Sequence, residues 1–542
     1  YHRAPHRARM SPPPENENTI FRMAQAGKTA ELDREFEEAY QDLRKRVGRT
    51  FPMLIGGKEV TSSRTFDDLD PSTGEVIARF PKGTEADVDA AVKAAKGAQF
   101  AWEQMGWEKR VAIFERAAEI MRERRPMLAA LMAIENGKNR IEAYYDVDEA
   151  IDFLKFYAWH MRQNNGFVVQ LGKPFPDETC VSVMRPWGVF AVVGPFNFPV
   201  AIPTGMTTGA LITGNAAVLK PASDTPWTAY EVVRILHDAG VPKDVLNFVT
   251  GGGREVGQTL IDHPDTGGLV FTGSREVGMR NYQSFVARKP RPYIAEMGGK
   301  NATVVTKNAD LEIAATGAVK SAFGFGGQKC SATSRIYVHE SVYDAFMEKL
   351  VEKAKKLRVD LPWKKEADLG PLINKAAVET FENAVAEAKK AGCQVLVGGS
   401  VLKDGEFANG NFVQPTVVAG LPNSNNAFRT EYFVPFVAVG TFRDNEEVVR
   451  EVNSADYGLT FGVVSNDPQE VDWFFARIEA GVVYANRDRG TSTGAMVGGQ
   501  SFGGWKFSAT TDRGAGGPWY LQQFLREQSR TYASGMRPPT RS

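Results

Sequence analysis

"FGFGGQKCSA", residues 323–332, places one of only three cysteines of the chain at the end of a glycine-rich run. A cysteine attacks as the thiolate, and an ordinary thiol pKa of about 8.5 leaves only a few per cent ionised near neutral pH. No histidine lies within eight residues of Cys330, so a Cys-His pair would need a distant histidine. Taken alone, Cys330 fits a small buried filler better than a nucleophile, and its meaning depends on the motifs around it.

Composition excludes several classes of protein. The 542 residues carry 65 basic and 65 acidic side chains, and this balance gives no electrostatic attraction to nucleic acid or to an anionic membrane. We therefore expect a small-molecule substrate, and the length fits two to four domains. The three scattered cysteines form no CxxC pair and fit a reducing cytosol. The six histidines lack ligand spacing, so we expect no metal site.

Residues 1–49 are expected to form an N-terminal arm that is partly disordered. The arm begins with Arg3, Arg7 and Arg9 and lacks the apolar run of a secretory signal. We expect a cytoplasmic protein, or a mitochondrial matrix protein if this Arg-rich segment is the remnant of a transit peptide. No later segment has eighteen apolar residues in a row, so we expect no transmembrane helix.

Short apolar runs alternate with helical patterns after residue 50. The runs "WGVFAVVGPF", "NAAVLKPA", "GGLVFTGS" and "NATVVT" predict buried strands, because they are short, rich in Val and Ala and bounded by Gly or Pro. Residues 341–357 show the apolar spacing of a helix with one buried face. Strands joined by helices indicate a parallel α/β sheet, in which ligands bind at the carboxyl ends of the strands.

A dinucleotide fingerprint G-x-G-x-x-G is absent, so an ordinary Rossmann phosphate loop is disfavoured. In "VFTGSREVG" a strand ends near Phe271, Gly273 permits a turn and Ser274 can cap a helix, whose free N–H groups attract anions. Lys220 ends another strand and could hold a ribose or a phosphate. Each signal is weak by itself, because most helix caps and strand-end lysines bind nothing.

Two further motifs carry polar groups suited to acyl transfer. Glu296 in "AEMGGKN" lies beside two glycines that let the backbone approach a ligand, and it could act as general base for a water. Asn197 in "GPFNFP" lies between two prolines, and its amide could donate to an oxyanion. Taken singly, the glutamate is as well explained as a surface charge and the asparagine as a turn former.

The order of these motifs resembles the aldehyde dehydrogenase superfamily from about residue 50 to the end of the chain. "AEMGGKN" and "FGFGGQKC" resemble its two signatures, and "EYF" at 431–433 follows them in the expected order. The resemblance implies that Cys330 adds to an aldehyde carbon, that loss of hydride to a nicotinamide leaves a thioester, and that Glu296 activates the hydrolytic water. Asn197 and the backbone N–H of Cys330 would form the oxyanion hole.

The same resemblance implies NAD as cofactor. Ser223 stands where a glutamate often pairs with the adenosine ribose, so NADP could be tolerated because its 2′-phosphate meets no repelling charge. The implied cofactor contacts are Lys220, Ser223, Gly273, Ser274, Glu431 beside a ribose, and Phe433 beside the nicotinamide.

The implied architecture is α/β, with a variant Rossmann cofactor domain, an α/β catalytic domain and a β-flap for oligomerisation. The expected ranges are 50–165 and 190–296 for the cofactor domain, 297–499 for the catalytic domain, and 166–189 with 500–542 for the flap and tail. An exposed flap strand is an unpaired edge, so we expect a homodimer or a higher homo-oligomer.

Residues 491–521 resemble the C-terminal region of 1-pyrroline-5-carboxylate dehydrogenases within that superfamily, which implies oxidation of L-glutamate γ-semialdehyde in proline catabolism. N–H groups around Gly494 and Ala495, with the hydroxyl of Ser331, would bind the α-carboxylate. Phe198 and Phe502 would flank the aliphatic stem.

Three positions depart from the family pattern, namely Val434, Ser501 and Ala509. The departures leave open a dehydrogenase for another semialdehyde or a simple aliphatic aldehyde. A catalytically silent homologue with a structural role is disfavoured because Asn197, Glu296 and Cys330 are all present. A cysteine hydrolase is disfavoured because no histidine accompanies the cysteine.

Overall fold

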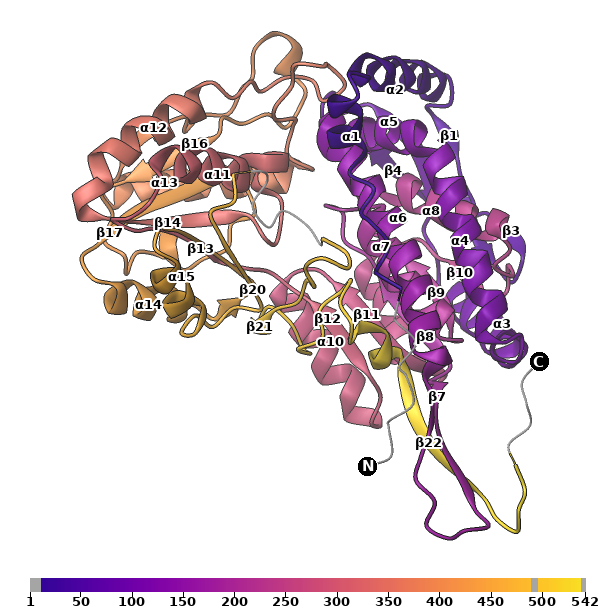
Figure 1. The fold of residues 1–542 in the computed structure, drawn as a ribbon. Helices are drawn as coiled ribbons and strands as arrows, with labels where there is room; N and C mark the ends of the chain where they lie inside the picture. The colour runs from indigo at the N-terminus through magenta and orange to yellow at the C-terminus, as the bar shows by residue number, and fades with distance from the viewer. Residues whose placement is uncertain (1–10, 489–495, 538–542) are drawn as a thin grey trace.

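The computed structural model describes residues 11–488 and 496–537. Two α/β lobes face each other, and a narrow β-ribbon projects from one of them (Figure 1). No helix among the described residues is both long and apolar enough to cross a membrane.

The first lobe is built on a seven-stranded sheet with the order β12-β11-β8-β9-β10-β2-β3, in which the five strands from β12 to β10 are parallel. Its strands are β2 (Met53–Ile55), β3 (Lys58–Val60), β8 (Val189–Val193), β9 (Ala216–Lys220), β10 (Leu246–Phe248), β11 (Thr266–Thr272) and β12 (Tyr293–Glu296). Its helices are α3 (Glu85–Gln104), α4 (Trp107–Glu123), α5 (Arg125–Glu135), α6 (Arg140–Gln163), α7 (Ala201–Ile212), α8 (Pro226–Ala239), α9 (Gln258–Asp262) and α10 (Arg275–Arg288).

The N-terminal arm adds two helices to this lobe, α1 (Thr19–Gln25) and α2 (Thr29–Arg44). Their buried residues include Phe36, which is fully inaccessible and packs with the main core cluster. The next segment of the chain forms a small sheet of β1 (Arg49–Thr50), β5 (Val76–Pro81) and β4 (Thr65–Leu69). Partial disorder of the arm stays a prediction, because residues 1–10 lie outside the described residues.

The second lobe has a seven-stranded sheet with the order β15-β16-β17-β14-β13-β19-β20, parallel except for the β15–β16 pair. Its strands are β13 (Asn301–Val305), β14 (Thr333–His339), β15 (Gln394–Val397), β16 (Thr416–Ala419), β17 (Phe436–Phe442), β19 (Thr460–Val464) and β20 (Val482–Ala485). Its helices are α11 (Leu311–Phe323), α12 (Tyr343–Lys355), α13 (Lys375–Lys390), α14 (Asn445–Asn453) and α15 (Pro468–Phe475).

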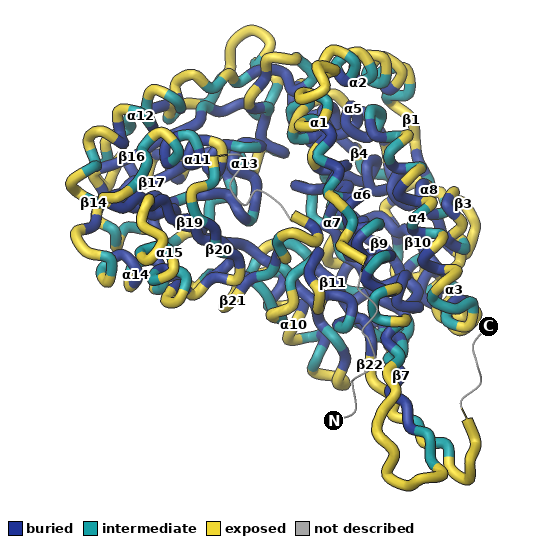
Figure 2. The backbone as a smooth tube through the Cα atoms, in the orientation of Figure 1, coloured by how far each residue is buried: buried dark blue, intermediate teal, exposed yellow. Residues whose placement is uncertain are grey.

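The projecting ribbon is a three-stranded antiparallel sheet with the order β22-β7-β6. It consists of β6 (Val168–Gln170), β7 (Thr179–Pro186) and β22 (Leu525–Tyr532), so the C-terminal segment pairs with the segment expected to form a flap. A two-stranded sheet of β18 (Tyr457–Gly458) and β21 (Trp505–Lys506) joins the C-terminal region to the second lobe. In the ribbon, β22 and the connecting turns are largely exposed, whereas β7 is largely buried (Figure 2).

The four predicted strands are confirmed as β8, β9, β11 and β13, and the predicted helix as α12. Neighbouring β11 and β12 run parallel, with Thr272 opposite Glu296 at their carboxyl ends. Polar side chains therefore lie at the carboxyl edge of this sheet, where ligands are expected to bind. The expected domain ranges stay a prediction. The strands of the second sheet lie within 297–499, and those of the first lie within 50–165 and 190–296 except for Val189 at the start of β8.

We predict that Asn215→Ala destabilises the first lobe. The buried Asn215 side chain accepts hydrogen bonds from the N–H groups of Trp187 and Gly188 and donates to the carbonyls of Ala210 and Phe524. Its loss leaves buried backbone groups without partners, which costs about 2–5 kcal/mol. Thermal unfolding should show a lower midpoint, whereas the exposed control Asn409→Ala should not change it. Equal midpoints for both variants would contradict this role of Asn215.

Candidate active site

The Cys330 loop is held in a strained conformation that only a glycine-rich sequence adopts easily. Phe325, Gly326 and Gly327 have φ angles of 48°, 60° and 69°, in the left-handed region. A Cβ on Gly327 would lie 2.5 Å from the Val434 carbonyl oxygen, so the loop packs directly on that backbone. The Cys330 carbonyl accepts a 2.7 Å hydrogen bond from Asn301 Nδ2.

The surroundings of the Cys330 thiol disfavour its ionised form. Burial raises the thiol pKa far above its usual range, and the charges of Glu431, Glu296 and Glu149 add to this rise, while the Ser331 N–H opposes it. These surroundings therefore favour the protonated thiol over the thiolate. Cys330 is also not part of a disulfide, because Cys180, Cys330 and Cys393 are all unpaired.

Glu296 ends β12 and lines the same pocket as Cys330. Burial raises the pKa of its carboxyl well above the usual range, and the Gly504 N–H offsets this only in part. Its Oε2 is buried and has no hydrogen-bond partner among the described residues. A buried, unpartnered carboxyl oxygen in a cavity is the arrangement expected for a group that handles a water.

Asn197 is buried, and its Nδ2 donates a 3.0 Å hydrogen bond to the Gln328 carbonyl, two residues before the cysteine. An amide group has two N–H donors, and the described residues provide one acceptor for it. The side chain is thus held against the Cys330 loop with a donor to spare.

The expected cofactor residues gather at the carboxyl edge of the first sheet. Lys220 ends β9, and burial lowers its pKa to about 8, with Pro221 O as its hydrogen-bond acceptor. Ser274 is confirmed as the N-cap of α10, where its Oγ accepts from the Val277 N–H. Gly273 does not have a positive φ; it is required because a Cβ there would lie 2.6 Å from the Phe271 ring. Ser223 is exposed three residues after β9.

Glu431 and Phe433 lie across from this edge in the second lobe. The Gly299 N–H donates to Glu431 Oε1 at 2.8 Å, and burial raises the Glu431 pKa to about 7. A Cβ on Gly298 would lie only 1.9 Å from Glu431 Oε2, so this carboxylate packs over bare backbone. Phe433, with a φ of 59°, packs edge-on against Phe196 at 5.9 Å between ring centroids.

The residues present fit a dinucleotide. A buried lysine with a single backbone acceptor, the free N–H groups at the start of α10 and an acidic group over bare glycine can bind a phosphate and ribose hydroxyls. Gly257 lies beside the Lys220 side chain, and a Cβ there would make ordinary contact with it at 3.5 Å.

The pocket beside Cys330 is largely apolar and spans about 570 Å³ including its open mouth. Phe198, Phe502 and Ser331 line it, as the sequence predicted, and all three are at most 9% exposed. Gly494 and Ala495 lie outside the described residues, so the anchor that they were expected to form stays a prediction.

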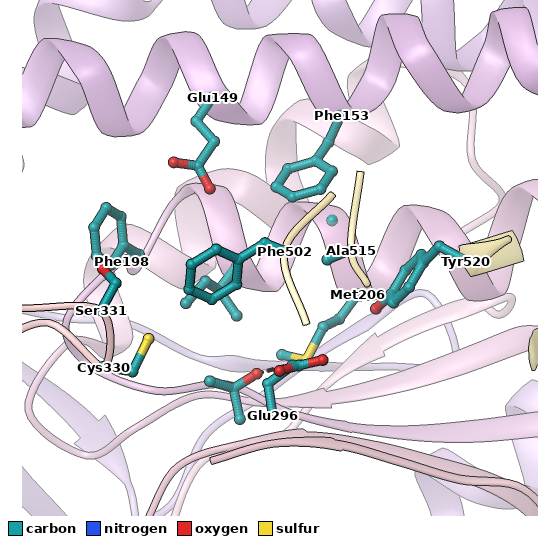
Figure 3. Close-up of a pocket in the computed structure, with 13 residues that line it drawn as sticks. Glu149, Phe153, Phe198, Met206, Glu296, Cys330, Ser331, Phe502, Ala515 and Tyr520 are labelled. Atoms are coloured by element: carbon teal, nitrogen blue, oxygen red, sulfur yellow. Dashed lines mark hydrogen bonds between the residues drawn. The ribbon is translucent and has the colours of Figure 1, made fainter. Parts of the chain in front are cut away.

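Sequence reasoning missed the contribution of α6. Glu149 and Phe153 are four residues apart, so they project from one helical face, and both line the pocket. Figure 3 shows the Glu149 carboxylate entering from α6, on the side opposite Cys330 and Glu296, with the Phe502 ring between them. The sequence does show an acidic residue followed four positions later by phenylalanine. That spacing is common in helices with no functional role, so it does not identify a pocket wall.

Two of the residues that depart from the family pattern, Val434 and Ala509, contact the site through their backbone. Val434 contributes the carbonyl against which Gly327 packs, and Ala509 forms a bridge with Glu296. Neither contact depends on the side chain. Ser501 is exposed and packs near Gly517.

The comparisons with known proteins agree with this geometry. The profile of the aldehyde dehydrogenase family matches residues 59–529. A 1-pyrroline-5-carboxylate dehydrogenase of Geobacillus sp. (strain WCH70) is 40% identical over 511 residues, which are 93% of this chain and 96% of that protein.

Solved structures are similar over the same extent. A 1-pyrroline-5-carboxylate dehydrogenase from Thermus with bound NAD is 36% identical, with a TM-score of 0.88 over 92% of this chain and 96% of that one. Betaine aldehyde dehydrogenase from Staphylococcus aureus in complex with NAD+ is 28% identical, with a TM-score of 0.85 over 92% and 97% of the two chains. On the match of sequence, fold and site together, this chain belongs to the aldehyde dehydrogenase family.

Proposed function

We propose that this chain oxidises L-glutamate γ-semialdehyde, which is in equilibrium with 1-pyrroline-5-carboxylate, to L-glutamate in proline catabolism, with NAD as cofactor. The observation that carries the proposal is one pocket that holds the Cys330 thiol and Glu296 on one side and the Glu149 carboxylate on the other. The relatives named 1-pyrroline-5-carboxylate dehydrogenase, matched over more than nine-tenths of this chain, support the choice of substrate.

Each end of the substrate meets matching chemistry. The Cys330 sulfur adds to the aldehyde carbon, and the resulting oxyanion lies where Asn197 Nδ2 and the Cys330 N–H can donate to it. Glu149 pairs with the α-ammonium at the far end, while Ser331 and the N–H groups around Gly494 and Ala495 bind the α-carboxylate. The rings of Phe198 and Phe502 flank the methylene groups between them.

NAD, when bound, supplies the hydride acceptor that converts the thiohemiacetal on Cys330 into a thioester. Lys220, Ser223, Gly273 and Ser274 hold it along the first sheet, and Glu431 and Phe433 hold it from the second lobe. Ser223 brings no negative charge, so NADP is tolerated. Glu296 then takes a proton from the water that hydrolyses the thioester.

The assembly that we propose is a homodimer or a higher homo-oligomer formed through the ribbon of β6, β7 and β22. Among the described residues, the outer strands β6 and β22 are paired on one side only. Val169 in β6 and Phe175 in the connection from β6 to β7 are 56% and 63% exposed. Three unpaired cysteines fit a reducing compartment such as the cytosol.

We predict that alkylation of Cys330 by iodoacetamide in the cofactor-free protein accelerates with pH without a plateau below about pH 9. Burial and three nearby carboxylates raise the thiol pKa, so the thiolate fraction keeps growing as pH rises. Cys330→Ala should take up no label at this site and lose all turnover, whereas the control Cys393→Ala should keep both. A plateau near neutral pH would contradict the environment described for the thiol.

We predict that Glu296→Gln separates the two halves of the reaction. The amide cannot accept a proton, so the thioester should form and then persist, giving a burst of NADH of about one equivalent per site and a steady rate reduced about a hundredfold or more. Stopped-flow absorbance at 340 nm measures both phases. A burst-free trace with normal turnover would remove Glu296 from the hydrolytic step.

We predict that Glu149→Gln distinguishes the proposed substrate from the alternative of a simple aldehyde. Loss of the charge that pairs with the ammonium should lower kcat/KM for glutamate γ-semialdehyde about tenfold to a hundredfold, but leave propanal and succinic semialdehyde within about threefold. The same change should accelerate alkylation of Cys330, because one charge that raises the thiol pKa is gone.

If wild type prefers propanal, or if the variant loses all three aldehydes equally, the substrate assignment fails and another aldehyde is the substrate. Silence of the wild type with every aldehyde and both cofactors would favour a non-catalytic homologue.

A further inference from the structure

One buried lysine has no role in the reaction proposed above. It lies between the loop that carries Asn197 and the Cys330 loop. Lys138 belongs to the connection between α5 and α6 and is 0% exposed. Its Nζ donates to Asp146 Oδ2 at 2.5 Å, and the other oxygen of Asp146 accepts from the Ala201 N–H at the start of α7. A fully buried ammonium is costly unless it is paired and satisfied, so its retention here requires an explanation.

Lys138 also contacts two aromatic rings. Its Nζ lies 3.9 Å from the ring centroid of Phe198 and 4.9 Å from that of Phe325. Both distances are within the range of an attractive cation–π contact, which is stronger in a desolvated site. Phe198 follows Asn197 directly, and Phe325 lies in the strained turn that leads to Cys330.

The same short connection also holds the residue on the other side of Asn197. Asn136 Nδ2 donates to the Phe196 carbonyl at 2.7 Å, so the connection binds both Phe196 and Phe198. The connection is itself fixed, because Gly137 has a φ of 79° and packs against Pro371 of the second lobe, with only 2.9 Å between a Cβ there and that ring. Asn197 is therefore clamped from both sides by a rigid element that reaches the other lobe.

We infer that Lys138 is a positioning residue, which aligns the Asn197 amide with the Cys330 sulfur by holding Phe198 and Phe325 on one buried ammonium. The inference rests on the proposed roles of Asn197 and Cys330, but not on the identity of the aldehyde. Its consequence is specific: loss of the cation should impair reactions that pass through an oxyanion more than reactions of the thiol that do not.

Two reactions of the cofactor-free protein separate these effects. With p-nitrophenyl acetate, the Cys330 sulfur bonds to the acyl carbon through a tetrahedral oxyanion, p-nitrophenolate leaves, and water later releases acetate. With iodoacetamide, the sulfur displaces iodide from carbon and no oxyanion forms. The initial burst of p-nitrophenolate counts competent sites, so each rate is expressed per site.

The test variant is Lys138→Met combined with Asp146→Asn, which removes both charges but keeps an oxygen acceptor for the Ala201 N–H. We expect its acylation by p-nitrophenyl acetate to be about a hundredfold slower. Its alkylation should stay within about threefold of wild type. Lys155→Met is the matched control, because Lys155 lies in α6 and pairs with Glu17 but contacts neither loop, and it should change neither rate.

Acylation of the double variant within about threefold of wild type would overturn the inference, and so would equal loss of acylation and alkylation, which would show a structural role only. If the double variant loses its native near-UV circular dichroism, Phe325→Leu is tested in its place in the same two assays. This change keeps the ion pair and removes one ring contact, so acylation should slow about tenfold while alkylation is retained. Unchanged acylation in Phe325→Leu would then overturn the inference.

Discussion

The whole site depends on the close approach of bare backbone within the second lobe, beside the Cys330 thiol. A Cβ on Gly299 would lie 2.5 Å from the Cys330 carbonyl oxygen, and a Cβ on Gly327 would lie 2.5 Å from the Val434 carbonyl oxygen. Contacts this short exist only where side chains are absent. They fix the cysteine loop against the loops of Glu296 and Glu431, so the spacing of the reactive groups is set by main chain and not by flexible side chains.

This packing creates the electrostatic environment of the site. Three carboxyl groups, those of Glu149, Glu296 and Glu431, act on the Cys330 thiol, and burial raises the pKa of Glu296 and Glu431 as well as that of the thiol. Burial therefore disfavours the ionised form of each of these groups. This is expected because neutral groups are less costly to bury than ions.

The reacting groups and the residues that face them across the pocket come from different parts of the chain. The reacting groups come from the loop after β8, from the last residue of β12 and from the loop after η3 (Gly324–Gly327). The residues opposite them come from α6 and from the C-terminal segment, through Glu149, Phe153 and Phe502. Different members of one family can therefore keep the first set and exchange the second to bind different aldehydes.

The sequence by itself determined the local chemistry. The strands β8, β9, β11 and β13, the cap at Ser274 and the glycines beside Glu296 could be predicted, because each depends on neighbouring residues in the chain. What brought Asn197, Glu296 and Cys330 into one site was a family resemblance, since nothing local in the sequence joins residues so far apart. Glu149 and Lys138 could not be predicted, because an acid on a helix and a lysine in a short connection are ordinary features of a surface. Only the tertiary structure buries Lys138 between two loops and places Glu149 at the wall of the pocket, and a charge in such a desolvated setting acts more strongly than one in water.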